Sequence, residues 1–207
     1  MPETDDFHAL IQTLKNSVAA LRERDIPFML GGSLAAWARG GPEPKKDLDL
    51  MVKPQDAERA LEALVAAGMT AERPPEEWLV KAWHDEVLVD VIFRPSGLEI
   101  TDEVLARADT IPLMAVGTPV MALEDVLVTM LCALDEHGLD YTRLIAIARS
   151  LREQIDFPRL QARTSDHPYA RAFFTLVQEL GVAPASPAGH AGASEGQSRV
   201  RVLPGGA

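Results

Sequence analysis

The spacing of apolar residues changes near Ala122, and this change limits the folds available to the chain. Before Ala122, short β-rich runs alternate with amphipathic helical segments, whereas after it only helical spacing is found. Glycines and prolines separate the β-rich runs, as is typical of short strands. We therefore expect an α+β fold. A small mixed β-sheet flanked by helices should occupy residues 1–121, and a small C-terminal helical subdomain should occupy residues 122–182.

The same patterns predict the individual elements. The tail over residues 183–207 is rich in Gly, Ala, Ser and Pro and has few large apolar side chains, so we expect it to be disordered. The expected strands cover residues 28–30, 47–52, 78–84, 87–93 and 113–116, with a hairpin turn at 84–86. The expected helices cover residues 6–24, 34–37, 54–67, 101–109, 122–136, 140–152 and 168–181.

Composition excludes several classes of protein. The 207 residues are 47% hydrophobic and 25% charged, and charge interrupts every apolar run well short of the ~20 residues that span a bilayer. The N-terminus has no signal peptide pattern and Cys132 is the only cysteine, so we expect a cytoplasmic protein with no membrane contact. The net charge of −11 argues against a broad nucleic-acid interface but permits a small polyanion bound with its metal.

Three aspartates are candidates for a metal site. Asp47 and Asp49 alternate with leucines, so in a strand both point to the same face. Asp90 is the only charge in the apolar run 87–93, where a lone carboxylate is costly unless it is paired or bound to metal. If the two strands are neighbours, three carboxylates converge and favour Mg²⁺ or Mn²⁺. The alternative is an ordinary solvated strand face, with Asp90 as an edge-strand charge.

A glycine turn precedes these carboxylates. Gly31, Gly32 and Ser33 follow the strand at 28–30 and open a short helix, for which Ser33 is a candidate N-cap. Glycines allow backbone amides to approach a phosphate closely, and the serine hydroxyl can donate to the same group. The turn alone is not specific, because an ordinary strand-to-helix connection uses the same residues. Its position before the paired aspartates and the isolated acidic strand makes the combination more specific than any part.

The motifs LGGS, DLDL and VDVIF, in this order, resemble those of the polymerase-β-like nucleotidyltransferase superfamily. Residues 34–46 separate the first two motifs. Within the superfamily, the chain is most similar to the small bacterial AbiEii/MenT-type nucleotidyltransferases, several of which are toxins of toxin–antitoxin pairs. The helical half, ALEDVLVTMLCALDEHGLDYTRLIAIARSLREQIDF, resembles the C-terminal helices of these proteins. The resemblance covers roughly residues 7–181.

This resemblance implies an activity and a fold of the nucleotidyltransferase type. A nucleoside monophosphate would pass from an NTP such as ATP to an acceptor hydroxyl, and pyrophosphate would leave. The acceptor would be a tRNA or a protein, and a cognate antitoxin would be a partner. The resemblance implies that Asp47, Asp49 and Asp90 are catalytic and bind Mg²⁺ or Mn²⁺, and that Gly31, Gly32, Ser33 and Lys46 bind the nucleotide.

One position departs from the family pattern. The family often carries a lysine where this chain has Met130, and methionine cannot neutralise triphosphate charge. Arg143, Lys45 or Lys46 could replace that lysine, or nucleotide affinity or activity could be lost. Asp140 either matches a downstream acidic position of the family or caps a helix. The alternative function is therefore a non-catalytic, degenerate transferase that acts as a nucleotide- or protein-binding module. Nucleotidylation of a small molecule is a less favoured enzyme function.

Overall fold

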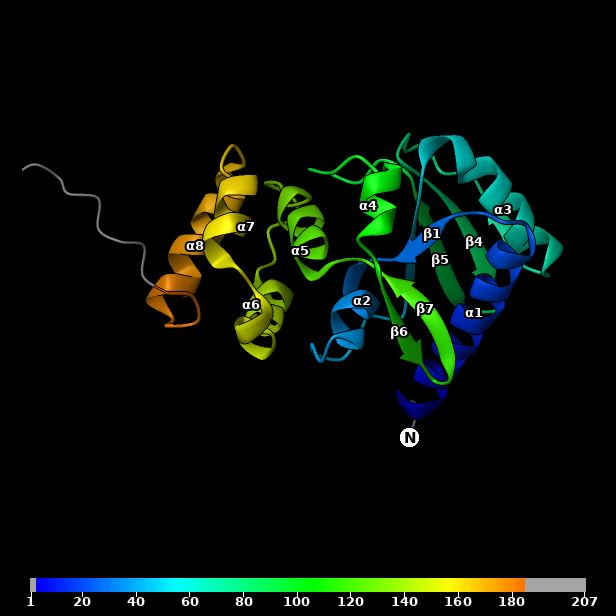
Figure 1. Ribbon diagram of the computed structural model, residues 1–207, viewed down its shortest axis with the longest axis horizontal. Coiled ribbons are helices and arrows are strands. Elements are labelled where there is room, and N and C mark those ends of the chain that lie inside the picture. The colour runs from blue at the N-terminus through cyan, green and yellow to red at the C-terminus, as the bar shows by residue number, and fades with distance from the viewer. Residues whose placement is uncertain (1–2, 185–207) are drawn as a thin grey trace, which may run out of the picture.

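The computed structural model describes residues 3–184, and within them one mixed β-sheet forms the centre of the molecule. Its seven strands lie in the order β3-β4-β5-β2-β1-β7-β6 (Figure 1). The strands are β1 Phe28–Leu30, β2 Leu48–Val52, β3 Thr70–Glu72, β4 Leu79–His84, β5 Val87–Ile92, β6 Asp109–Leu113 and β7 Val116–Val120.

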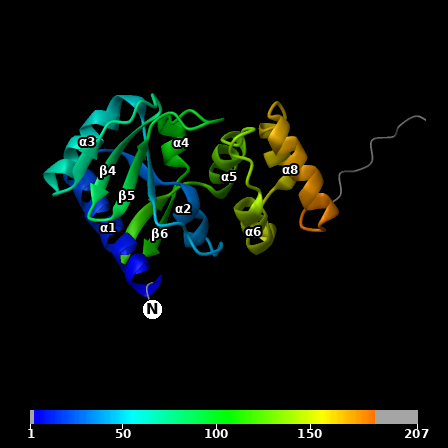
Figure 2. The same ribbon diagram turned by 180° about the vertical axis from the view of Figure 1, so that it is seen from behind.

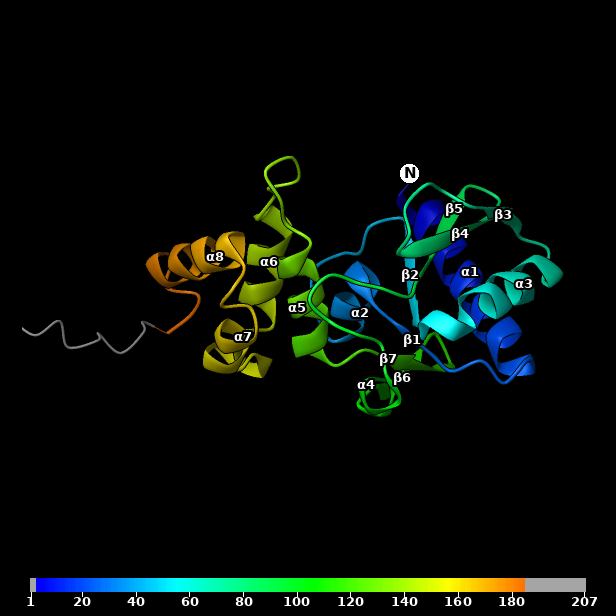
Figure 3. The same ribbon diagram turned by 90° about the horizontal axis from the view of Figure 1, so that it is seen from above.

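Helices cover the sheet unequally on its two faces. Helices α1 and α3 pack on one face, whereas α2 lies on the other face and contacts α5 (Figure 3). The helices α5 to α8 gather beside the sheet, on the side of α2 (Figures 1 and 2). The α-helices are α1 Glu3–Glu23, α2 Gly32–Ala38, α3 Ala57–Ala66, α4 Asp102–Ala106, α5 Leu123–Cys132, α6 Thr142–Ser150, α7 Phe157–Arg163 and α8 Pro168–Glu179, and short 3₁₀ turns cover Pro54–Asp56 and Arg152–Gln154.

The pairing of β2 determines where the chemistry can occur. β2 runs antiparallel to β1 and parallel to β5, and in this register Asp49 lies opposite Asp90. Leu48, Leu50 and Val89 are fully buried toward α1 and α3. Because side chains alternate along a strand, the aspartates point to the opposite face, toward α2.

The sequence predictions fail in the segment between α4 and α5. The strand expected over 113–116 is wrong, because Met114 and Ala115 have φ angles of 45° and 70° and form the turn of the β6–β7 hairpin. The helix expected over 101–109 ends earlier, at Ala106, and Asp109 already belongs to β6. β6 contains Pro112 and little apolar alternation, so its sequence carries no clear strand pattern. The sequence also did not predict β3 or α7.

The side chain of Arg39 joins α2 to the connection between β7 and α5. Its Nη2 donates to the carbonyl oxygens of Val120 and Met121, at 3.1 and 2.8 Å, and forms an ion pair with Asp109 at 2.8 Å. Gln154 in turn donates to the Arg39 carbonyl oxygen at 3.2 Å. These contacts tie the sheet to the helices that follow it.

The predicted disorder of residues 183–207 falls, apart from Ala183 and Pro184, outside the described residues. Within residues 3–184, no helix has the length and apolarity that crossing a membrane would require.

Candidate active site

Asp47, Asp49 and Asp90 meet on one face of the sheet. Asp49 lies within β2, Asp47 immediately precedes that strand, and Asp90 lies in β5. One carboxylate oxygen from each lies within 4.8 Å of the others. The expected convergence of the three carboxylates is therefore found in the structure, produced by the parallel pairing of β2 with β5.

Burial disfavours the charged forms of two of these carboxylates, Asp49 and Asp90. Burial, followed by the charges of Asp47 and Asp90, raises the pKa of Asp49 to about 7. Burial also raises the pKa of Asp90, although Lys81, whose Nζ lies 4.0 Å from the carboxylate, opposes the rise. The Oδ1 atoms of Asp47 and Asp90 are buried and have no hydrogen-bond partner among the described residues. An all-oxygen set with unsatisfied buried acceptors fits a hard divalent cation such as Mg²⁺ or Mn²⁺.

The glycine turn is packed directly against Asp49. The Gly31 amide donates to the Asp49 carbonyl oxygen at 2.9 Å, and the Ser33 amide donates to the Asp49 carboxylate. Gly32 has φ +56°, and a Cβ at this position would overlap Asp49 Oδ2. A glycine is therefore required both by the backbone conformation and by the proximity of the carboxylate.

The sequence predicted that Ser33 caps α2, and this prediction is wrong. The N-cap is Gly31, and Ser33 lies buried in the first turn of the helix. Its Oγ accepts a hydrogen bond from the Lys45 amide at 2.9 Å. The serine therefore anchors the loop that returns the chain to β2, close to the carboxylates.

A cavity of about 470 Å³ opens beside the carboxylates. Residues on its wall come from both halves of the chain. Trp78, whose exposed fraction is 45%, lies in this wall and was not singled out by sequence reasoning, because a tryptophan between charged residues and a strand carries no specific pattern. The wall includes Gly32, Asp49, Trp78, Arg94, Met130 and Asp135.

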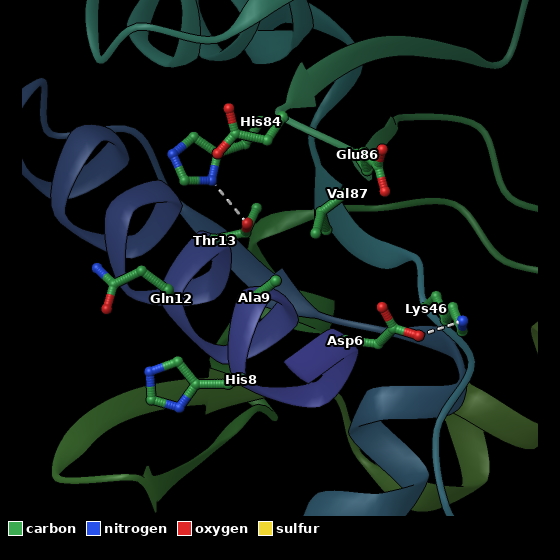
Figure 4. Close-up of a pocket in the computed structure, with 10 residues that line it drawn as sticks. Asp6, His8, Ala9, Gln12, Thr13, Lys46, His84, Glu86 and Val87 are labelled. Carbon is green, nitrogen blue, oxygen red and sulfur yellow. Dashed lines mark hydrogen bonds and ion pairs between the residues drawn. The ribbon is translucent and has the colours of Figure 1, made fainter. Parts of the chain in front are cut away.

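Lys46 lies in a different cavity. It forms an ion pair with Asp6 of α1 and lines a space of about 700 Å³ between α1 and the β4–β5 hairpin (Figure 4). On the far side of that space, the Thr13 hydroxyl lies 2.8 Å from His84 Nδ1. Lys46 and the glycine turn, both expected to bind the nucleotide, are therefore not brought to a common cavity.

The other basic residues considered from the sequence also lie outside the 470 Å³ cavity. Arg143 donates to the Glu43 carbonyl oxygen at 2.9 Å. Lys45 is exposed, and its charge lowers the pKa of Asp49 without offsetting the effect of burial.

Asp140 accepts a hydrogen bond from the Thr142 amide at 2.8 Å, in the turn that leads into α6. The N-cap of α6 is Tyr141, so Asp140 lies one residue before the cap position considered for it.

Solved structures share this fold. The antibiotic-resistance factor ANT(2″)-Ia in solution superposes with a TM-score of 0.58 at 13% sequence identity, covering 83% of this chain and 96% of that one. ANT(2″)-Ia in complex with adenylyl-2″-tobramycin gives a TM-score of 0.55 at 14% identity, covering 80% and 97%. The lincosamide antibiotic adenylyltransferase LnuA, with lincomycin bound, gives 0.48 at 13% identity, covering 66% and 92%. The mixed sheet with its flanking helices therefore has a nucleotidyltransferase-type fold.

The sequence assigns the family more directly. Residues 8–188 match the model of a family described as "Uncharacterised nucleotidyltransferase", and the chain belongs to this family. A search of curated protein sequences finds no match to the chain.

Proposed function

We propose that this protein is a metal-dependent nucleotidyltransferase that transfers a nucleoside monophosphate from an NTP to an acceptor hydroxyl. The observation that carries the proposal is the cluster of Asp47, Asp49 and Asp90, with two buried oxygens lacking partners, at the edge of a nucleotide-sized cavity. Asp47, Asp49 and Asp90 would hold Mg²⁺ or Mn²⁺, which when bound would neutralise phosphate charge.

The proposed reaction is a single displacement at the α-phosphorus of the NTP. The acceptor oxygen forms a bond to the α-phosphorus, the bond from that phosphorus to the bridging oxygen breaks, and pyrophosphate leaves. Asp90 would complete the metal site or take the proton of the acceptor hydroxyl. Gly31, Gly32 and Ser33 would keep the backbone beside the phosphates and hold Asp49 in position.

The resemblance suggests a tRNA or a protein as the acceptor, in a toxin–antitoxin pair. A second candidate is a small, amine-bearing and hydroxylated molecule. Two observations favour it. The chain spans nearly the whole length of ANT(2″)-Ia, which has been crystallised in complex with adenylyl-2″-tobramycin, and its net charge of −11 would repel RNA and attract a cationic acceptor.

The test of activity uses each of the four NTPs labelled on the α-phosphate, with Mg²⁺ or Mn²⁺. The acceptors are total RNA, total protein and a panel of aminoglycosides. Wild type should label one acceptor class, and Asp47→Asn and Asp49→Asn should not. Equal labelling by wild type and both variants would refute the catalytic role of these residues.

A binding measurement separates the enzyme from the non-catalytic alternative. Mn²⁺ should raise the melting temperature of wild type more than that of Asp47→Asn or Asp49→Asn, because a cation that binds only the folded state stabilises it. If Mn²⁺ and nucleotide bind but no acceptor is labelled, a nucleotide-binding module is favoured. If neither binds, the proposed function fails.

A further inference from the structure

The 470 Å³ cavity has a negatively charged wall, which would repel the phosphates of a bound nucleotide. Asp49 and Asp135 contribute negative charge to its wall, and a triphosphate would add several more negative charges. A divalent cation at the aspartate cluster would offset only part of this charge. Met130, which also lines the cavity, contributes none. An additional cation is needed for tight binding of a polyphosphate.

Among the described residues that line this cavity, Arg94 is the one with a cationic side chain. It lies just beyond β5, the strand that carries Asp90. Its side chain is exposed and lies over the ring of Phe93, with Cζ 5.8 Å from the ring centroid. It forms no salt bridge with any residue in the described part of the chain. Within residues 3–184, no carboxylate therefore neutralises its charge.

The backbone around Arg94 is held in place on both sides. The amides of Phe93 and Arg94 donate to the Trp78 carbonyl oxygen, at 3.0 and 3.2 Å. Three residues further on, Gly97 has φ +73° and packs so closely on α5 that a Cβ would lie 2.5 Å from Cys132 Sγ. The loop that bears Arg94 therefore packs against the helix that bears Met130.

We propose that Arg94 is a triphosphate-binding residue, which supplies from the end of β5 the positive charge that Met130 does not supply from α5. This inference rests on the proposed function, because it requires a nucleoside triphosphate in the cavity. A guanidinium can donate two parallel hydrogen bonds to phosphate oxygens, which suits recognition of the terminal phosphates. Lys45, Lys46 and Arg143 do not line the cavity, so none of them is placed to replace Arg94 there.

Binding of non-hydrolysable α,β-methylene analogues of the four NTPs, with Mg²⁺, tests the inference by calorimetry. The corresponding nucleoside monophosphates serve as a second ligand set. Arg94→Ala should bind the triphosphate analogue roughly tenfold to a hundredfold more weakly than wild type and the monophosphate almost equally. Arg94→Lys should retain an intermediate affinity. Arg149→Ala removes the same charge from an exposed position of α6 outside the cavity and should bind like wild type.

A double variant that moves the positive charge from position 94 to position 130 provides the sharpest test. Met130→Lys places a cation in the wall of the same cavity, on α5, so it should restore much of the triphosphate affinity when combined with Arg94→Ala. Circular dichroism and thermal unfolding establish that each variant is folded.

The outcomes separate this inference from the proposed function. If wild type binds none of the four analogues, the proposed function fails. If wild type binds one and folded Arg94→Ala binds it equally well, the inference is overturned and the proposed function stands. Equal losses for triphosphate and monophosphate, or no recovery in the double variant, would also overturn the assignment of Arg94 to the phosphates.

Discussion

Asp49 holds its proton more tightly in the folded chain than an ordinary aspartate does. Burial and two neighbouring carboxylates disfavour its charge and raise its pKa from the ordinary 3.8 to about 7 in the folded protein. A raised pKa contributes stability that is fully present below about pH 4 and is lost as the pH rises through 7. The free energy of unfolding of the metal-free protein is therefore expected to fall as the pH rises from about 4 to 7.

Asp49→Asn isolates the contribution of this single group. In EDTA, wild type and Asp49→Asn should have similar free energies of unfolding near pH 4, whereas at pH 8 wild type should be less stable than the variant by on the order of 1–3 kcal/mol. Urea denaturation across the pH range measures the difference. A difference that does not vary with pH would contradict the assigned pKa.

Gly32 is expected to tolerate no side chain. Gly32→Ala combines a left-handed backbone with direct overlap of Asp49 Oδ2, so it should cost at least ~2 kcal/mol and weaken Mn²⁺ binding. Gly68→Ala is the matched control, since Gly68 has φ +96° but nothing within 4 Å of the added Cβ. The control should lose only the backbone contribution and keep wild-type Mn²⁺ affinity. Equal effects of both substitutions on Mn²⁺ binding would show that proximity to Asp49 is unimportant.

Three helices meet at one buried carboxylate. Asp125 of α5 has a side chain 2% exposed and binds Arg107 at the end of α4, at 2.8 Å, and Arg163 of α7, at 2.6 Å. This arrangement ties α5, which bears Met130, to the end of α4 and to α7. This cluster could not be predicted from the sequence, because its members come from separate segments and no local pattern relates them.

Asp125→Asn should therefore destabilise the protein by about 3 kcal/mol, because it removes the charge that two arginines share in a buried setting. Glu153→Gln is the control, since Glu153 is 88% exposed and, in the described part of the chain, pairs only with its neighbour Arg152. Its effect should stay within about 0.5 kcal/mol. Guanidinium denaturation of both variants provides the comparison, and a loss for Asp125→Asn no larger than for the control would show that the buried pair is unimportant.

Local patterns predicted the elements that have strong periodicity or clear punctuation. The β4–β5 hairpin, the strand with the paired aspartates and most helices were predicted to within a few residues, because apolar spacing directly encodes which face is buried. Weakly apolar elements such as β3 and β6 form through pairing with a neighbouring strand, which one segment alone does not reveal. The convergence of Asp47, Asp49 and Asp90 could be predicted because a buried charge needs a partner. The position of Arg94 could not, because a surface loop residue has no periodic signal.

The whole molecule brings the sheet and the helical half together around the 470 Å³ cavity. We propose that the boundary between the two parts lies near residues 121–122, where β7 has ended and α5 has not begun. Arg39 spans this connection through Val120 and Met121. Any movement of the helical half relative to the sheet would have to occur around these Arg39 hydrogen bonds.

Gly97 packs closely on Cys132, the only cysteine of the chain. The rate at which this thiol is alkylated should therefore report movement of the loop that bears Arg94 and Gly97 relative to α5. The thiol is partly covered, and burial raises its pKa, so alkylation should proceed mainly when the loop moves away from α5. A nucleotide that bridges the loop and the helix should slow the reaction with iodoacetamide severalfold in wild type and much less in Arg94→Ala. Mass spectrometry follows this reaction without engineered labels, and unchanged alkylation on saturation with nucleotide would show that the loop is already closed in the free protein.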